Sequence, residues 1–291
     1  MLQKRRTADG SDQRLQMDDL IIHENCNQQK RKIKTVYAGK ERMIMATVKK
    51  EALIAIRPIV KKEIRLRIVG DSPLITHCWD AKAKRQILEK ELGIKSVRGN
   101  EKKNPVADFA SSMYWLDPMP MDLTEESVNT AIMNGARFGF PLTGVKQAAI
   151  SAAYRMGWSK DKASLRGAFF IKPEFDGYYA GDLMISDDKK SVEIVPNAVH
   201  PEPMIEIHAE SVKMREDMVK VGMGAADIRY RGQFENWWSE FSVVYNENGD
   251  KTIDEIITIL NAGGYVCGLG EWRPERDGQY GMFHVEIESI R

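Results

Sequence analysis

The sequence contains only three cysteines and no apolar run long enough to cross a membrane. Cys26, Cys78 and Cys267 are odd in number and widely spaced, which argues against a disulfide framework and favours a reducing compartment such as the cytoplasm. Spanning a bilayer takes roughly 20 consecutive apolar residues. The N-terminal segment is charged and lacks the apolar centre of a secretory signal peptide. We therefore expect neither a membrane protein nor a small secreted scaffold.

The familiar signatures of catalysis and metal binding are also missing. The sequence has no GxxxxGK[ST] phosphate loop, no HExxH, no paired CxxC and no GxSxG. Without these patterns there is no case for a P-loop nucleotidase, a zinc site or a serine hydrolase. We expect no cofactor and no metal.

What remains is a globular composition with an uneven charge distribution. The chain has 291 residues, of which 43% are apolar and 29% charged, typical of one large or two small domains. Residues 1–67 carry 17 Lys and Arg against 8 Asp and Glu, although the whole chain is near +1. A basic N-terminal part suits phosphate-rich partners, and the alternative is a solvated arm without a partner. We expect a basic flexible arm at 1–45 and a folded domain at 46–291.

Alternating and helical patterns predict the elements of that domain. Ile64, Leu66 and Ile68 alternate with arginines, as in a half-buried strand. A helix is expected from Asp80 to Leu92, and another after the capping box of Thr252 and Glu255. Further strands are expected at 226–234, 238–246 and 281–289, the first two as antiparallel neighbours. In the middle of the chain we expect a short helix at 123–135, a longer helix at 144–156 capped by Thr143, and strands at 166–171, 191–196 and 204–212.

This order indicates an α+β fold. With residues 93–225 treated as an insertion, the elements read β-α-β-β-α-β, which is the ferredoxin-like (RRM-like) unit. Both helices would then cover one face of the sheet and leave the other face free.

Alternation predicts which side chains occupy the free face. Arg65 and Arg67 of the first strand, Arg229 and Arg231 of the second, and His284 of the last would all point outward. Four arginines on one surface would form a phosphate track. The alternative is that the carboxylates of Asp227, Glu240 and Glu286 neutralise them as surface ion pairs.

The most informative segment is GGYVCGLGEWRPERDGQYGMFHVE, residues 263–286. Glycines allow close backbone approach and left-handed conformations, and successive N–H groups in such a turn can bind an anion. Arginines can hold phosphates in a bidentate manner, and an indole can stack on a base. The predicted binding residues of this loop are Gly268, Gly270, Trp272, Arg273, Arg276, Gly278 and Gly281. The alternative is a long loop whose glycines only satisfy turn geometry.

The motif G268-L-G270-EWRPERD-G278-QY-G281-MFHV resembles the C-terminal glycine-rich motif of the RAMP superfamily, the RNA-binding proteins of CRISPR antiviral systems. The first strand and its DSPLITH turn (71–77) resemble the effector-backbone branch of that family. The resemblance implies guide-RNA binding and implicates the four glycines, with Arg273 and Arg276 by position. A distant phage or mobile-element relative is the alternative origin.

The leading hypothesis is a non-enzymatic protein that binds single-stranded RNA through its backbone and assembles along it as a homo-oligomer or ribonucleoprotein subunit. His77 and the basic helix residues Lys82 and Arg85 would extend the contacts. Two alternatives stay open. One is a metal-independent RNA endonuclease with His77 as general base, and the other is a phage protein that binds or anneals single-stranded DNA.

Overall fold

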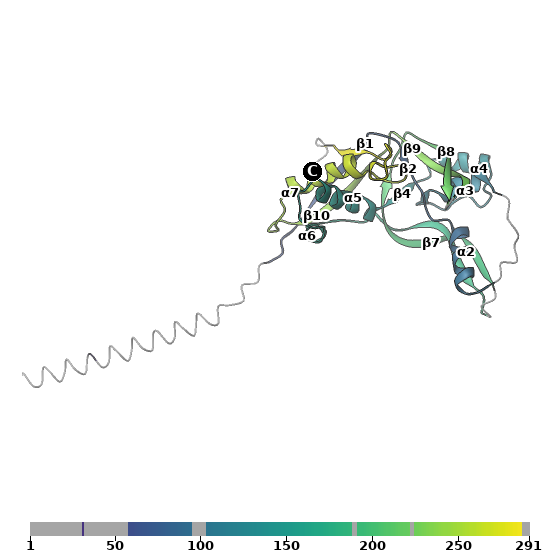
Figure 1. The fold of residues 1–291 in the computed structure, drawn as a ribbon, viewed down its shortest axis with the longest axis horizontal. Helices are drawn as coiled ribbons and strands as arrows, with labels where there is room; N and C mark the ends of the chain where they lie inside the picture. Colours follow the sequence, from purple (N-terminus) through teal and green to yellow (C-terminus); the bar gives the residue numbers. More distant parts are fainter. Residues whose placement is uncertain (1–30, 32–57, 95–102, 188–190, 222–223, 287–291) are drawn as a thin grey trace, which may run out of the picture. The chain divides into compact units, whose positions relative to one another are not determined.

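The computed structural model describes residues 31, 58–94, 103–187, 191–221 and 224–286. The chain divides into two units, 1–58 and 59–291, and all the helices and strands named below belong to the second. Apart from Arg31, the expected arm at 1–45 lies outside the described residues, as do the basic segment 95–102 and Ile287. The described part is an α+β protein built on antiparallel sheets (Figure 1).

Short helices and strands of very different lengths follow one another along the described chain. The strands are β1 (Lys61–Gly70), β2 (Leu74–Ile75), β3 (Tyr114–Trp115), β4 (Phe138–Pro141), β5 (Phe169–Ile171), β6 (Phe175–Ile185), β7 (Val192–Ile207), β8 (Ser211–Val221), β9 (Ala225–Glu235), β10 (Trp238–Asn246) and β11 (Phe283–Val285). The helices are α2 (Ala81–Glu91), α3 (Pro105–Ser111), α4 (Glu125–Met133), α5 (Leu142–Arg155), α6 (Ala163–Arg166) and α7 (Ile253–Ala262), with a π-helical turn η1 (Gly263–Cys267) and a 3₁₀ turn η2 (Pro274–Arg276).

A four-stranded antiparallel sheet in the order β11-β1-β10-β5 contains the first strand predicted from the sequence. Leu66 and Ile68 of β1 and Phe241 and Val243 of β10 are fully buried, in one core with side chains of α5 and α7. Arg65 and Arg67 alternate with these residues and lie on the opposite face. The predicted alternation of β1 is therefore confirmed.

Helix α5 packs against α7 and η1 because its contact face consists of small residues (Figure 1). Ala148, Ala149, Ala152 and Ala153 are all buried. Opposite them, a side chain at Gly263 would place its Cβ 2.8 Å from the backbone nitrogen of Ala149. The two backbones therefore approach each other where neither carries a bulky side chain.

Two further sheets complete the second unit. Strands β2, β9 and β8 form one in that order, and β3, β4, β7 and β6 close into a small barrel. Helix α3 contacts β9, and α2 contacts β6 and β7. Within the described residues, no helix is both long and apolar enough to span a membrane.

Two predictions about the four-stranded sheet are wrong. The helix at 80–92 does form, with the Asp80 side chain accepting from the Lys82 N–H (3.2 Å), but it packs on β6 and β7, and α5 contacts α7 instead. Residues 226–234 do form a strand, but β9 pairs with β8 and β2, and the neighbours of β10 are β1 and β5. Local periodicity predicts that a strand forms, but it carries no information about which strand it pairs with.

Helix starts are close to their predicted positions. Thr252 and Glu255 form the predicted capping box of α7, with the Thr252 N–H donating to Glu255 Oε2 (2.9 Å). Helix α4 begins after Thr124, whose side chain accepts from the Ser127 N–H. Helix α5 begins at Leu142 after Pro141, one residue before the predicted cap Thr143, and no side chain caps it.

Candidate nucleic-acid interface

His77 lies where two pockets meet, just after β2. The backbone on either side of it is fixed, because the Thr76 N–H donates to the Gly232 carbonyl (3.0 Å) and the Cys78 N–H to the Ser112 carbonyl (2.8 Å). Burial lowers the pKa of His77, and the nearby positive charge of Arg231 lowers it further. The imidazole is therefore neutral at neutral pH, with one ring nitrogen that donates a hydrogen bond and one that accepts.

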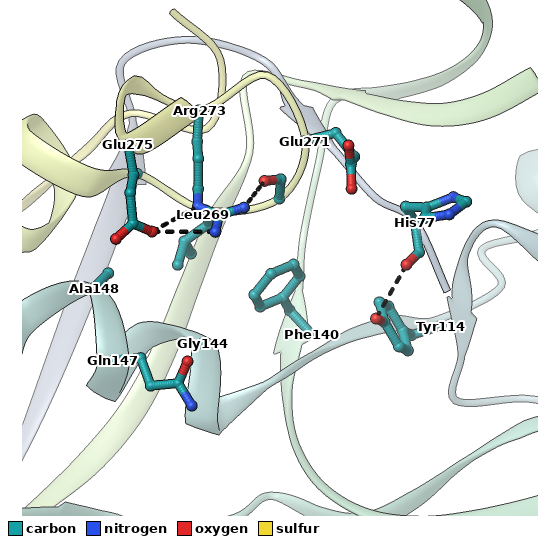
Figure 2. A pocket seen from close by; sticks show the side chains of 12 residues that line it. His77, Tyr114, Phe140, Gly144, Gln147, Ala148, Leu269, Glu271, Arg273 and Glu275 are labelled. Carbon is teal, nitrogen blue, oxygen red and sulfur yellow. Dashed lines mark hydrogen bonds and ion pairs between the residues drawn. The ribbon is translucent and has the colours of Figure 1, made fainter. Parts of the chain in front are cut away.

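The first pocket, which we call the loop pocket, has a volume of about 180 Å³ and lies between the glycine-rich loop and α5 (Figure 2). Gln147 points toward it from α5, whose N-terminal turn also contributes Gly144. Its lining consists of His77, Tyr114, Phe140, Gly144, Gln147, Ala148, Gly268, Leu269, Gly270, Glu271, Arg273 and Glu275. The glycine-rich segment therefore lies next to a cavity, whose lining also includes the carboxylates of Glu271 and Glu275.

Three of the four predicted glycines of the loop, Gly268, Gly278 and Gly281, donate their N–H groups within the protein. The Gly268 N–H donates to the Gly263 carbonyl (2.9 Å), Leu269 to Gly281 (2.9 Å), and Gly281 to Pro73 (2.8 Å). This contradicts the expectation that these amides form a concavity of free donors. At these positions the loop fits the alternative reading of the sequence, in which the glycines only satisfy turn geometry.

Backbone crossings explain the glycines. Gly281 has φ +66°, and a Cβ there would lie 1.9 Å from the Leu269 carbonyl oxygen. Gly270 has φ +70°, and its Cβ would lie 2.2 Å from the Ile75 carbonyl oxygen. At Gly278 the Cβ would meet the carbonyl oxygen of Trp272 at 1.7 Å. Each glycine thus marks a place where the loop passes directly over another stretch of backbone.

The three predicted binding side chains of the loop have different surroundings. Arg273 donates through Nε and Nη2 to Glu275 (3.2 and 3.1 Å) and through Nη1 to the Gly270 carbonyl (2.8 Å), as Figure 2 shows. The indole N–H of Trp272 donates to Asp217 Oδ2 (3.1 Å). Arg276 is exposed and forms no side-chain hydrogen bond or ion pair within the described residues. Of the three, Arg276 is the one whose donors point to solvent.

A buried ion network connects the loop to the β8–β9 hairpin. Asp217 is 6% exposed and accepts from Arg231 Nη1 (2.9 Å) and Arg215 Nε (2.7 Å), as well as from Trp272. Arg231, only 2% exposed, also lies 3.6 Å from Glu271. Burial raises the pKa of Asp217, but the hydrogen bonds from Arg215, Arg231 and Trp272 outweigh it and leave the pKa below its usual value.

This network was not predicted from the sequence, although a signal was present. In β8, the charged residues at 215, 216 and 217 lie between exposed methionines at 214 and 218. In the register of the hairpin, Arg215 faces Arg231 and Asp217 faces Arg229. These cross-strand pairs place three arginines around one aspartate. Had the pairing of the two strands been known, this would have indicated that the residues share one charged face of the hairpin.

The four arginines predicted to share one surface lie on two different sheets. Arg65 and Arg67 are on β1, whereas Arg229 and Arg231 are on β9. Arg231 is buried, so the prediction of one four-arginine track is wrong. The predicted outward orientation on β9 therefore fails for Arg231, whereas the Arg229 side chain is partly exposed.

The carboxylates named as the alternative do pair with the other three arginines. Nε of Arg65 donates to Glu240 (3.1 Å), and Nε of Arg67 lies 3.4 Å from Glu286. The guanidinium of Arg67 also lies over the ring of Trp238. Arg229 lies 3.6 Å from Asp227, and His284 is exposed as predicted, 2.7 Å from Asp71.

The second pocket, which we call the α3 pocket, has a volume of about 590 Å³, within the range of small-molecule sites. Lys103 spans one side of it by binding Asp227 Oδ1 (2.6 Å) and the Ile228 carbonyl. Its lining consists of His77, Cys78, Trp79, Asp80, Ala83, Ile87, Lys103, Asp108, Ser111, Ser112, Asp227, Arg229 and Tyr230. It combines an indole, a phenol, two cations and three carboxylates.

The predicted helix residues contribute little to either pocket. Arg85 is buried and lies 3.8 Å from Glu89, which contradicts its prediction as a surface contact. Lys82 is half-buried in the first turn of α2. The α2 residues that line the α3 pocket are Ala83 and Ile87 instead.

The described residues contain no group of three or more His, Cys, Asp or Glu side chains placed to hold a metal ion. The chain matches no model of a known protein family, and no curated protein shows significant similarity to it. The two pockets that meet at His77 are therefore the candidate binding site of the protein.

Proposed function

We propose that the protein binds single-stranded nucleic acid, with RNA as the expected ligand, and holds it without cleaving it. The observation that carries this proposal is the pair of adjoining pockets at His77. The α3 pocket offers the aromatic rings of Trp79 and Tyr230 for a base, and Trp79 is 59% exposed. Stacking on such rings is how single-stranded nucleic acids are commonly held. The exposed Arg276 offers donors to a phosphate on the glycine-rich loop.

The charge distribution supports the same proposal. Residues 1–58 carry 13 Lys and Arg against 7 Asp and Glu, whereas 59–291 carry 30 against 35. The second unit is thus acidic overall, and its arginines are largely paired with carboxylates. We propose that the N-terminal unit supplies most of the phosphate contacts, so binding weakens as salt rises.

The proposed family is the RAMP superfamily, with a ferredoxin-like core made of β1, α5, β5, β10, α7 and β11. Supporting this are the antiparallel order β11-β1-β10-β5 and the position of the glycine-rich loop between α7 and β11. From the resemblance, the ligand is a guide RNA and the assembly is a filament of repeated subunits. A heterologous interface with open rotation gives such a filament.

Equilibrium binding to a fluorescein-labelled, unstructured RNA tests the proposal. Trp79→Ala is expected to weaken binding about tenfold, because stacking on an aromatic ring is worth about 1–3 kcal/mol per base. Trp158→Ala is the matched control, since this exposed tryptophan (44%) lines neither pocket. Absence of RNA binding by the wild-type protein at low salt contradicts the proposal. DNA of the same sequence tests the single-stranded DNA alternative.

A second candidate, metal-independent RNA cleavage, is favoured by one observation. The lowered pKa of His77 keeps its imidazole neutral, as a general base that deprotonates a 2′-hydroxyl requires. If this activity exists, labelled hairpin RNA is cut at one site in the presence of a chelator, and His77→Ala abolishes the cut. Our leading proposal predicts intact RNA with both proteins. His200→Ala is a control, because this histidine lies outside both pockets.

A further inference from the structure

Two polar side chains of α3 that line the α3 pocket, Asp108 and Ser111, have no hydrogen-bond partner in the described part of the chain. Asp108 and Ser111 are both half-buried, and neither makes a side-chain hydrogen bond there. Their neighbours are occupied: Asp80 caps α2, Asp227 binds Lys103, and the Ser112 hydroxyl donates to the Phe109 carbonyl. The pocket thus presents a carboxylate that lacks hydrogen-bond donors and a hydroxyl that lacks a hydrogen-bond partner.

These two groups are arranged side by side. Asp108 and Ser111 are three residues apart on α3, so they share one face of the helix. Trp79, Ile87 and Tyr230 supply apolar surface to the same pocket. A flat, largely apolar ring with hydrogen-bonding groups along one edge matches this combination.

The charges of the pocket argue for a neutral donor rather than an ion. Its three carboxylates outnumber its two cations, so a phosphate is disfavoured, and Lys103 is already bound to Asp227. The described residues include no cluster suited to a metal ion. Burial raises the pKa of Asp108, as expected of a carboxylate that lacks the donors it needs.

We propose that the α3 pocket receives one unstacked base of the bound strand and selects guanine, whose N1–H and N2–H donate to Asp108 while Ser111 donates to O6. Adenine and cytosine place an acceptor next to their amino group, which would face the carboxylate. Uracil offers a single N–H between two acceptors. This inference rests on the proposed function, because it assigns the base preference of the same interface.

Binding of mononucleotides to the full chain tests the inference directly. GMP and IMP carry the same phosphate and differ in the N2 amino group, so calorimetric titration isolates the contact with Asp108. We expect GMP to bind about tenfold more tightly than IMP, since a bidentate contact discriminates by about 1–3 kcal/mol. In Asp108→Asn the preference is lost, because the amide presents a donor to the donors of the base. Asp250→Asn, an exposed residue outside the pocket lining, retains it.

The outcomes separate the inference from the proposed function. Equal affinity for GMP and IMP, with unstructured RNA still bound, overturns the guanine pocket and leaves nucleic-acid binding standing. A GMP preference without RNA binding supports the pocket and overturns the proposed function. Should Asp108→Asn fail to fold, Ser111→Ala serves instead: it is expected to weaken GMP severalfold while keeping GMP ahead of IMP. An unchanged GMP affinity in that variant contradicts the assigned contact with O6.

Discussion

Replacing Asp217 by leucine is expected to destabilise the protein by about 3–5 kcal/mol, the usual cost of removing one partner of a buried ion pair. Asp217 is 6% exposed and Arg231 is 2% exposed, so the guanidinium would remain buried without its carboxylate. Arg215 and Trp272 would lose an acceptor as well. Urea unfolding monitored by circular dichroism measures the change. A loss below about 1 kcal/mol would contradict the network as described.

Two comparisons test the cause of this effect. In the double variant Asp217→Leu/Arg231→Met the buried charge of Arg231 is gone and only the partly exposed Arg215 lacks its carboxylate, so stability should return most of the way to wild type. The pH dependence supplies the second comparison. Because the folded-state pKa of Asp217 lies below its ordinary value of 3.8, its contribution is present above about pH 4 and is lost as the pH falls through the lower folded-state value. The Asp217→Leu variant should lack this component of acid unfolding.

Gly281→Ala is expected to destabilise the protein by about 4 kcal/mol or more, the range of substitutions that combine overpacking with backbone strain, or to prevent folding. Its Cβ would lie 1.9 Å from the Leu269 carbonyl oxygen, which is backbone and cannot move aside as a side chain can. The left-handed φ of +66° adds about 1–2 kcal/mol for a residue with a side chain. The midpoint of thermal unfolding measures the loss.

Gly157→Ala is the matched control for this substitution. Its φ is similar at +73°, but nothing lies within 4 Å of a Cβ placed there. Only the conformational cost applies, so a loss of about 1–2 kcal/mol is expected. Equal effects at the two glycines would mean that φ alone explains them and that the crossing at Leu269 contributes nothing.

The sequence predicted those features that depend on neighbouring residues. The capping box of Thr252 and Glu255 and the alternation of β1 are local, and both are confirmed. The carboxylates that pair with Arg65 and Arg67 were also predictable, since Glu240 and Glu286 lie in segments that the sequence predicts as strands, 238–246 and 281–289. Patterns among neighbouring residues therefore predicted which segments form helices and strands better than they predicted how these helices and strands pack together.

Pairing between distant strands was not predictable, and the β9–β10 connection shows why. Only Asn236 and Trp237 separate the two strands, which normally indicates a hairpin. Here Asn236 has φ +47°, and the buried Trp237 donates from its indole to the Ser72 carbonyl (2.8 Å). His208 then forms both backbone hydrogen bonds with Trp238. These contacts redirect the chain into a different sheet, and they involve residues far away in the sequence.

The candidate site depends on the same kind of distant contact. His77 and the glycine-rich loop were recognisable from the sequence, but Asp108 and Ser111 were not. These two residues line a pocket only because α3 packs beside β9. Arg231 was recognised as basic, yet its burial follows from Asp217 on the neighbouring strand. Which polar residues stay unpaired is a property of the folded chain.

The close approach of Gly263 to Ala149 has a consequence for how this protein can vary. With the Cβ position of Gly263 only 2.8 Å from backbone, added volume can be accommodated only by separating α5 from the π-helical turn. Tyr154, 47% exposed on the same helix, has no such restriction. Tolerance of substitutions along α5 should thus alternate with the helical period, strict on the alanine face and permissive on the opposite one.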